Sequence, residues 1–257
     1  MDMEGSESIS ERDIPAVKPL ALSRQIISTI VVIAIVLWSS ALFLWRQGEL
    51  DKWLLISHNG LRTNELVVGV AQVASKYGMS IIVLVYLLYL LFAFKYEKLR
   101  DAYRIYLLVF LMLAFAGIGG DILKEVVDRP RPFVEYAGEI NALSSAETPA
   151  FPSGHATKSM ALALPFLLFI AAKDNWHKGV KILLAIVALG VCYSRVLLGA
   201  HYVSDVLAGV GMALICLPLV TLLNNGVLSV MTEKRLNFAI KVWAVILFGL
   251  MIYLAVI

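Results

Sequence analysis

Charged residues are scarce in this chain of 257 residues. Asp, Glu, Lys and Arg together make up 16% of it, whereas about a quarter is usual in soluble domains. Hydrophobic residues make up 60%, and the mean hydropathy is +0.82. This composition excludes an ordinary water-soluble domain and indicates a protein of the lipid bilayer.

Cysteine is rare as well, and clustered positive charge is missing. Cys192 and Cys216 lie in apolar runs without metal-ligand spacing, which favours small buried residues over a metal or redox site. The formal net charge is +3, but the basic residues are scattered over the connecting segments and form no tract. No nucleic-acid partner is therefore expected.

Long apolar runs account for most of the chain. A helix needs roughly 20 apolar residues to cross a bilayer, so runs of about that length predict an all-α, polytopic transmembrane helical bundle. The predicted crossings are at residues 25–45, 79–94, 103–123, 154–172, 180–198, 202–223 and 236–257. Residues 1–24 are too polar to bury a core and predict a mobile tail, and residues 66–74 predict a short interfacial helix.

The distribution of Lys and Arg predicts the orientation, because positively charged loops are retained in the cytoplasm. Twelve such residues lie on the amino-terminal side of the predicted crossings and eight on the opposite side. Three of these eight, Lys124, Arg131 and Arg195, have a chemical explanation given below. The amino terminus is therefore predicted to be cytoplasmic, and the loop at 129–153 to lie outside.

Three polar clusters interrupt the apolar pattern, and ionisable groups beside membrane helices are functional candidates by default. The first begins at Lys124, which Arg131 follows after six intervening residues. Pro130 and Pro132 cannot continue a helix, so the chain turns out of the membrane there. The alternative is that these are ordinary interfacial cations with their stems along the membrane surface.

The second cluster reads Phe-Pro-Ser-Gly-His at 151–155. Ser153 is a natural N-cap, and Gly154 lets a ligand approach the backbone. Together with the free amides and the dipole of the helix that follows, they predict a site for an anion such as phosphate. The alternative is a plain capped helix with an interfacial His155.

The third cluster runs from Ser194 to Asp205. If the sixth helix begins here, His201 and Asp205 are one turn apart on one face, so the carboxylate can hold one imidazole nitrogen and leave the other free to attack. The alternative is a satisfied hydrogen bond at a helix end. The predicted topology weakens all three alternatives, because it places the three clusters on the same outer membrane face.

The combined pattern is Lys-x6-Arg-Pro, Pro-Ser-Gly-His and Ser-Arg-x5-His-x3-Asp, spanning 124–205. It resembles the three-part signature of the type-2 phosphatidic acid phosphatase (PAP2) and vanadium haloperoxidase superfamily, and every signature position is filled. The resemblance implies a six-helix PAP2 core, here in a domain at 25–235. The crossing at 236–257 is then an additional carboxyl-terminal helix.

The resemblance also implies a role for each reacting group. His201 would be the nucleophile, Asp205 its orienting partner and His155 the general acid. Asp128 and Arg129 lie between signature positions and are interpreted as local ion-pair partners.

The remaining signature residues would bind the phosphate. Lys124, Arg131 and Arg195 would clamp the phosphoryl oxygens, and Ser153 and the Gly154 amide would add hydrogen bonds. Because three cations can neutralise the phosphate, no metal or other cofactor is expected.

The expected function is an integral membrane phosphatase that hydrolyses a lipid phosphate or diphosphate through a phosphohistidine. A lipid phosphotransferase or a lipid A phosphatase could use the same site. Two other functions are less favoured. A vanadium haloperoxidase would not need the membrane helices, and a transporter would not need the particular spacing of His201 and Asp205. The loop at 133–149 carries three glutamates and no basic residue, which favours undecaprenyl diphosphate or a phosphatidylglycerol phosphate type of lipid. The expected location is a bacterial inner membrane, with the site on its outer face.

Overall fold

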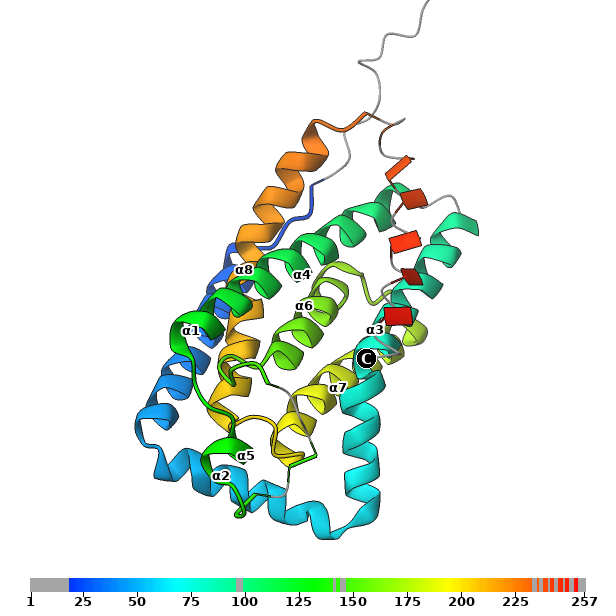
Figure 1. Ribbon diagram of the computed structural model, residues 1–257. Coiled ribbons are helices and arrows are strands. Elements are labelled where there is room, and N and C mark those ends of the chain that lie inside the picture. Colours follow the sequence, from blue (N-terminus) through cyan, green and yellow to red (C-terminus); the bar gives the residue numbers. More distant parts are fainter. Residues whose placement is uncertain are drawn as a thin grey trace, which may run out of the picture.

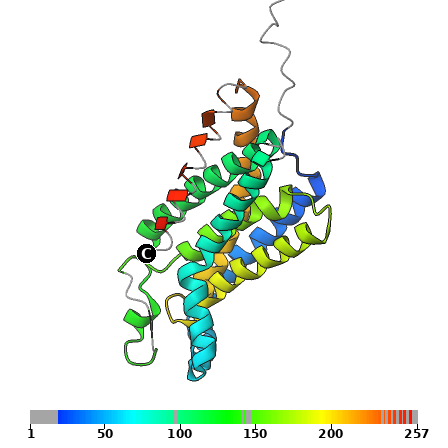
Figure 2. The same cartoon turned by 90° about the vertical axis from the view of Figure 1, so that its right-hand side faces the viewer.

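A computed structural model describes residues 19–95, 99–140, 142–143 and 147–232, with scattered residues between 235 and 253. Every regular element in this part of the chain is a helix, which confirms the all-α class, and Figures 1 and 2 show the long helices side by side in one bundle. The elements are α1 (Arg24–Arg46), α2 (Glu49–Asn59), the 3-10 turn η1 (Gly60–Thr63), α3 (Glu65–Lys95), α4 (Leu99–Val127), α5 (Pro132–Glu135), α6 (Gly154–Phe169), α7 (Asn175–Leu197) and α8 (Val203–Ser229).

Five helical segments in the described part of the chain are long and apolar enough to cross a membrane, at Arg24–Arg46, Glu65–Tyr89, Tyr103–Glu135, Asn175–Leu197 and Val203–Ser229. They correspond to five of the predicted crossings. The shorter α6, with 16 residues, corresponds to the crossing predicted at 154–172 and packs against α3, α4, α7 and α8. It is therefore the central helix of the bundle (Figure 1).

Two predicted segments lie mostly outside the described residues. Of the crossing predicted at 236–257, the structure describes only separate pairs of residues, which are helical. Of the predicted amino-terminal tail, residues 1–18 are outside the described part. Both interpretations stay predictions.

Apolar side chains cover the outer surface of the bundle. Val32, Ile35 and Phe43 on α1 and Ile186 on α7 are all more than half exposed in the isolated chain. Such a surface is unfavourable in water but is what hydrocarbon requires, and helices satisfy their own backbone hydrogen bonds there. The protein is therefore an integral membrane protein.

The prediction of a separate interfacial helix at 66–74 is wrong, because α3 runs without interruption from Glu65 to Lys95. The residues between the two predicted segments include Ser75 and Gly78, which face α7. Ser75 accepts a hydrogen bond from Arg195, and a Cβ on Gly78 would lie 2.3 Å from Cγ2 of Val191. Small residues at such a crossing let two membrane helices approach closely.

One end of the bundle gathers the helix termini that carry the polar clusters. At this end α4 and α7 finish, α6 and α8 begin, and α2 and α5 lie across them (Figure 1). Backbone hydrogen bonds join these segments: the Ser153 amide donates to the Asp205 carbonyl at 2.9 Å, and the Leu143 amide to the Leu198 carbonyl at 3.1 Å. The predicted convergence of the three clusters is confirmed.

Close packing of α6 against α8 depends on Gly209, and this generates a prediction. A Cβ on Gly209 would lie 2.7 Å from the Ser153 carbonyl oxygen and 3.0 Å from Oγ1 of Thr157. Gly209→Ala should push α8 away from the start of α6 and lower the melting temperature in detergent by about 3–10 °C. Gly226→Ala, on the same helix with nothing within 4 Å, is the control and should melt like the wild type. Equal melting temperatures for both variants would contradict this packing.

Candidate active site

The first cluster lies where α4 ends and the chain turns. Lys124 is in the last turn of α4, and Asp128 just after the helix has a φ of 44°. Pro130 and Pro132 flank Arg131, which sits in extended conformation before the short α5. The turn directs Lys124 and Arg131 into the same end of the bundle.

Arg131 is buried and held by the segments on both sides of it. Its Nε donates to the Thr148 carbonyl at 2.6 Å and its Nη2 to the Thr148 hydroxyl at 3.0 Å. Its Nη1 donates to the Ala200 carbonyl at 3.1 Å. The guanidinium is therefore fixed before any ligand binds, which reduces the cost of ordering it around a phosphate.

The second cluster opens α6 with an unsatisfied hydroxyl. Ser153 occupies the predicted N-cap position, although its side chain makes no capping hydrogen bond. Its Oγ is fully buried and has no hydrogen-bond partner in the described part of the chain. A buried hydroxyl without a partner costs free energy, and at a helix amino terminus it is available to an anion.

Lys124 reaches the same helix start. A Cβ added to Gly154 would lie 3.4 Å from Nζ of Lys124, so the ammonium group lies over the first turn of α6. His155 follows on that turn and is half-buried, and the charges of Arg195 and Arg131 act on it. The positive end of the helix and three side-chain cations thus gather around the start of α6.

The third cluster forms the predicted His/Asp pair. Nδ1 of His201 lies 3.3 Å from Oδ2 of Asp205, and both side chains are buried. On its other side, Nε2 of His201 lies 3.2 Å from Nη1 of Arg131. A guanidinium only donates, so Nε2 is the acceptor and the proton is on Nδ1. The lone pair of Nε2 therefore points at the Arg131 guanidinium, toward the cations.

The surroundings of His201 favour its neutral form. Burial, reinforced by the charges of Arg131, Arg195 and Lys124, holds the pKa of His201 well below its usual range. An unprotonated imidazole with a fixed tautomer is the form that can act as a nucleophile. The residue therefore needs no activation by loss of a proton at neutral pH.

Arg195 completes the set of cations from the last turn of α7. Its Nη1 donates to the Ser75 hydroxyl at 2.5 Å, while its Nε is buried without a partner in the described part of the chain. Its carbonyl accepts the amides of Ala200 and His201 at 3.0 and 3.1 Å. Gly199, with a φ of 68°, makes the intervening turn possible. This turn sets the distance between Arg195 and His201.

The interpretation of Arg129 and Asp128 as local partners is wrong. Arg129 is buried and bonds distant groups instead: Nη1 donates to Oδ1 of Asp205 at 2.8 Å, and Nη2 donates to Oδ2 of Asp51 at 2.9 Å. Asp51, on α2, is fully buried and also accepts hydrogen bonds from the amide and hydroxyl of Ser204. The sequence analysis missed Asp51 and Ser204. A carboxylate between two apolar runs was the available signal for Asp51.

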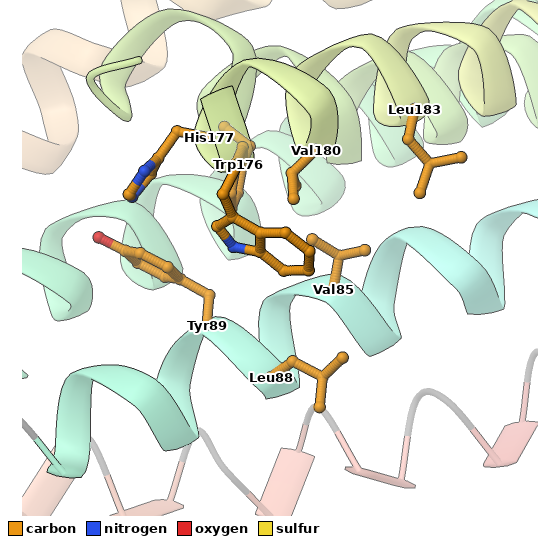
Figure 3. A pocket seen from close by; sticks show the side chains of 8 residues that line it. Val85, Leu88, Tyr89, Trp176, His177, Val180 and Leu183 are labelled. Atoms are coloured by element: carbon orange, nitrogen blue, oxygen red, sulfur yellow. The ribbon is translucent and has the colours of Figure 1, made fainter. Parts of the chain in front are cut away.

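An apolar cavity of about 390 Å³ lies elsewhere, between α3, α6 and α7. Figure 3 shows Trp176 and His177 from the start of α7 beside Tyr89 of α3. Arg195 lies 19 residues further along α7, about 28 Å at 1.5 Å per residue. The cavity is therefore separate from the cluster around His201. In the described residues, no group of three or more His, Cys, Asp or Glu side chains could hold a metal ion.

Comparison with known proteins identifies the family to which this membrane fold belongs. The profile described as PAP2 superfamily matches residues 105–229, which include the whole signature. Phosphatidylglycerophosphatase B of Bacillus subtilis is 30% identical over 158 residues, 59% of this chain and 70% of that protein. The chain therefore belongs to the PAP2 superfamily, as its motifs predicted, and is an integral membrane lipid phosphatase.

Two further comparisons, one of sequence and one of structure, point to the same family of membrane phosphatases. YbjG of Escherichia coli, named as a candidate undecaprenyl-diphosphatase, is 40% identical over 80 residues, 31% of this chain and 36% of that protein. The crystal structure of a transmembrane PAP2-type phosphatidylglycerolphosphate phosphatase from Bacillus subtilis superposes with a TM-score of 0.55. It covers 78% of this chain and 96% of that one at 22% identity. At that identity, the structural match supports the fold alone.

The unsatisfied hydroxyl of Ser153 generates the second prediction. A hydrogen bond to a charged group contributes about 1.5–3 kcal/mol, so Ser153→Ala should weaken inhibition by orthovanadate by about 10-fold to 100-fold. The melting temperature should stay near that of the wild type, because the hydroxyl has no partner in the described chain. The comparison is made on purified protein in detergent.

Ser159→Ala is the matched control. Ser159 is buried on the same helix, but its hydroxyl bonds the Ala156 carbonyl at 3.2 Å. This variant should leave vanadate inhibition unchanged. A Ser153→Ala protein that binds vanadate as tightly as the wild type would remove the hydroxyl from the anion site.

Proposed function

We propose that the chain removes phosphate from a lipid phosphate or diphosphate through a phosphohistidine on His201. The observation that carries this is the geometry of the imidazole: Nδ1 is held by Asp205 and Nε2 faces Arg131, the guanidinium fixed by Thr148 and Ala200. Nucleophile and electrostatic clamp are thus assembled around one position.

In the first step, Nε2 of His201 forms a bond to phosphorus as the bond from phosphorus to the lipid oxygen breaks. Once the negative charge of the bound phosphate offsets the surrounding cations, His155 carries a proton. It gives this proton to the departing oxygen, so the lipid leaves as a neutral alcohol or as a lipid monophosphate. The phosphoryl-imidazole carries positive charge, which the carboxylate of Asp205 stabilises through Nδ1–H.

In the second step, His155, now neutral, takes a proton from water as the water oxygen attacks phosphorus. The nitrogen–phosphorus bond breaks, inorganic phosphate leaves, and His201 returns to its starting tautomer. Lys124, Arg131 and Arg195 balance the charge of the phosphoryl oxygens in both steps, with hydrogen bonds from Ser153 and the Gly154 amide.

A phosphatidylglycerol phosphate or an undecaprenyl diphosphate type of lipid is the proposed substrate. The names of the relatives from Bacillus subtilis and Escherichia coli support this class. The loop at 133–149 carries no Lys or Arg, and the nearby Lys52 is already paired with Glu139 at 2.9 Å. These residues offer no second phosphate site of the kind that a lipid A would require at a distance from the first.

The test of this mechanism is the covalent intermediate. His201→Ala should abolish phosphate release, because it removes the imidazole that forms the phosphoenzyme in this mechanism. A lipid substrate labelled with phosphorus-32 and quenched at high pH, where phosphohistidine survives, should label the wild type and not this variant. His58→Ala, far along the chain on α2, is the control and should be labelled normally. Turnover or labelling in the His201→Ala protein would overturn the assignment.

We also propose that the amino terminus is cytoplasmic and the site faces the periplasm, or the exterior, of a bacterial inner membrane. The excess of Lys and Arg on the amino-terminal side supports this orientation. A lipid diphosphate left after glycan transfer on the outer face would then meet the enzyme where it is formed.

Single cysteines test this orientation. In a chain with Cys192→Ala and Cys216→Ala, Glu147→Cys lies in the loop beside the site, and Lys173→Cys lies in the connection between α6 and α7, at the other end. Both positions are exposed. A membrane-impermeant thiol reagent on intact cells should label Glu147→Cys only. Labelling of Lys173→Cys only would place the site in the cytoplasm.

A further inference from the structure

Arg129 is the buried cation that the phosphate clamp does not use. It lies two residues before Arg131, yet its contacts run to the other side of Asp205. Its Nη1 donates to Oδ1 of Asp205 at 2.8 Å and to the Ser204 hydroxyl at 2.6 Å, and its Nη2 donates to Oδ2 of Asp51 at 2.9 Å. One guanidinium thus bridges two fully buried carboxylates from different helices, α2 and α8.

The two carboxylates also share the start of α8. Oδ2 of Asp205 accepts the Tyr202 amide at 3.0 Å, and Oδ1 of Asp51 accepts the Ser204 amide at 3.2 Å. Both amides belong to the first turn, which has no partner inside the helix. Asp51 therefore caps α8 from outside, although it belongs to a segment some 150 residues earlier in the chain.

Aromatic rings fix the plane of the guanidinium. Its central carbon lies 3.7 Å from the ring centre of Tyr202 and 5.7 Å from that of Trp45. The Tyr202 hydroxyl in turn donates to Oε2 of Glu135 at 2.5 Å. Stacking of this kind suits arginine and would not be reproduced by the point charge of a lysine.

The charges in this group match what the reaction needs. Arg129 contributes one positive charge and the two aspartates two negative charges, so the trio carries one net negative charge next to His201. Without a partner, a carboxylate as buried as Asp205 would favour its uncharged form. With Arg129 in place, it stays ionised and can stabilise the positive charge that develops on the imidazole.

From this geometry we infer that Arg129 and Asp51 are positioning residues for phosphoryl transfer, acting through Asp205 and not on the phosphate. Arg129 holds Oδ1 so that Oδ2 faces Nδ1 of His201, and Asp51 holds Arg129 and the first turn of α8. The inference rests on the proposed function of His201. It extends the site to α2, which lies outside the signature at 124–205.

The experiment is a double-mutant cycle on purified protein with a lipid phosphate substrate. Arg129→Gln should lower kcat by about 10-fold to 100-fold, as is usual for partners that orient a reacting group. KM and the inhibition constant of orthovanadate should stay within about threefold of the wild type. In the Asp205→Asn protein, the same substitution should lower kcat by at most about a further threefold. The effects of substitutions are not additive when the residues act as one unit.

Asp51→Asn is a second test variant, which should disturb the fold less than Arg129→Gln does. It retains one acceptor oxygen for Ser204 while removing the charge, and it should lower kcat by about threefold to 10-fold, again only when Asp205 is present. Arg129→Lys keeps the charge but cannot bridge both carboxylates, and its kcat should fall between those of the wild type and Arg129→Gln. Should Arg129→Gln fail to fold, these two variants carry the test.

Two controls separate positioning from other effects. Lys52→Met, on α2 beside Asp51, removes the pair with Glu139 and the contact with the Tyr136 ring at 4.2 Å. This variant should keep the kcat of the wild type. A lower kcat would mean that any disturbance of α2 slows the reaction, whether or not Asp51 is changed. Arg195→Lys alters the clamp and should raise KM and the vanadate constant, in contrast to the Arg129 variants.

The inference would be overturned if the Arg129 and Asp51 substitutions lowered kcat by the same factor in the Asp205→Asn protein as in the wild type. An unchanged kcat in the Arg129 variants would overturn it as well. A vanadate constant raised as in Arg195→Lys would make Arg129 part of the clamp instead. If the wild-type protein released no phosphate, or released it equally well after His201→Ala, the proposed function itself would be contradicted. The inference about Arg129 and Asp51 would then fail as well.

Discussion

The carboxylate of Asp205 is fully buried, and its two oxygens are divided between neighbours on opposite sides. Oδ2 faces His201 and the Tyr202 amide, while Oδ1 accepts Arg129. A charge in such a place is tolerated only when it is paired and hydrogen-bonded. Because Arg129 comes from the end of α4 and Asp205 from the start of α8, satisfying this one charge brings together two of the helix ends that form the site.

The helices and the signature residues were predictable because their causes are local. Apolar length identifies most crossings and places some starts closely: the helix predicted at 202–223 is observed at Val203–Ser229. The spacing of four between His201 and Asp205 puts both on one helix face whatever surrounds them. The alternation of crossings then assigns each cluster to one end of the bundle, so the convergence of Lys124, Ser153 and His201 followed from topology alone.

The features that failed depend on contacts between distant segments. The predictions left residues 75–78 between two separate helices, because nothing in the sequence shows that α7 packs against Ser75 and Gly78. The prediction paired Arg129 with its neighbour Asp128, because the sequence does not show that α2 lies next to this arginine. Asp51, more than 70 residues away from Arg129, is a buried ligand of that arginine only because α2 lies across the ends of α4 and α8.

Arg131 contacts the nucleophile His201 in the ligand-free site and is also expected to contact the bound phosphate. Its Nη1 donates to Nε2 of His201 at 3.2 Å and to the Ala200 carbonyl at 3.1 Å, and it is also part of the proposed phosphate clamp. A phosphate oxygen is charged and accepts a hydrogen bond more strongly than an imidazole nitrogen does. An arriving phosphate therefore competes for this donor, and by taking it the phosphate frees the lone pair that attacks. Since Nε and Nη2 stay anchored on Thr148, the exchange needs no movement of the backbone.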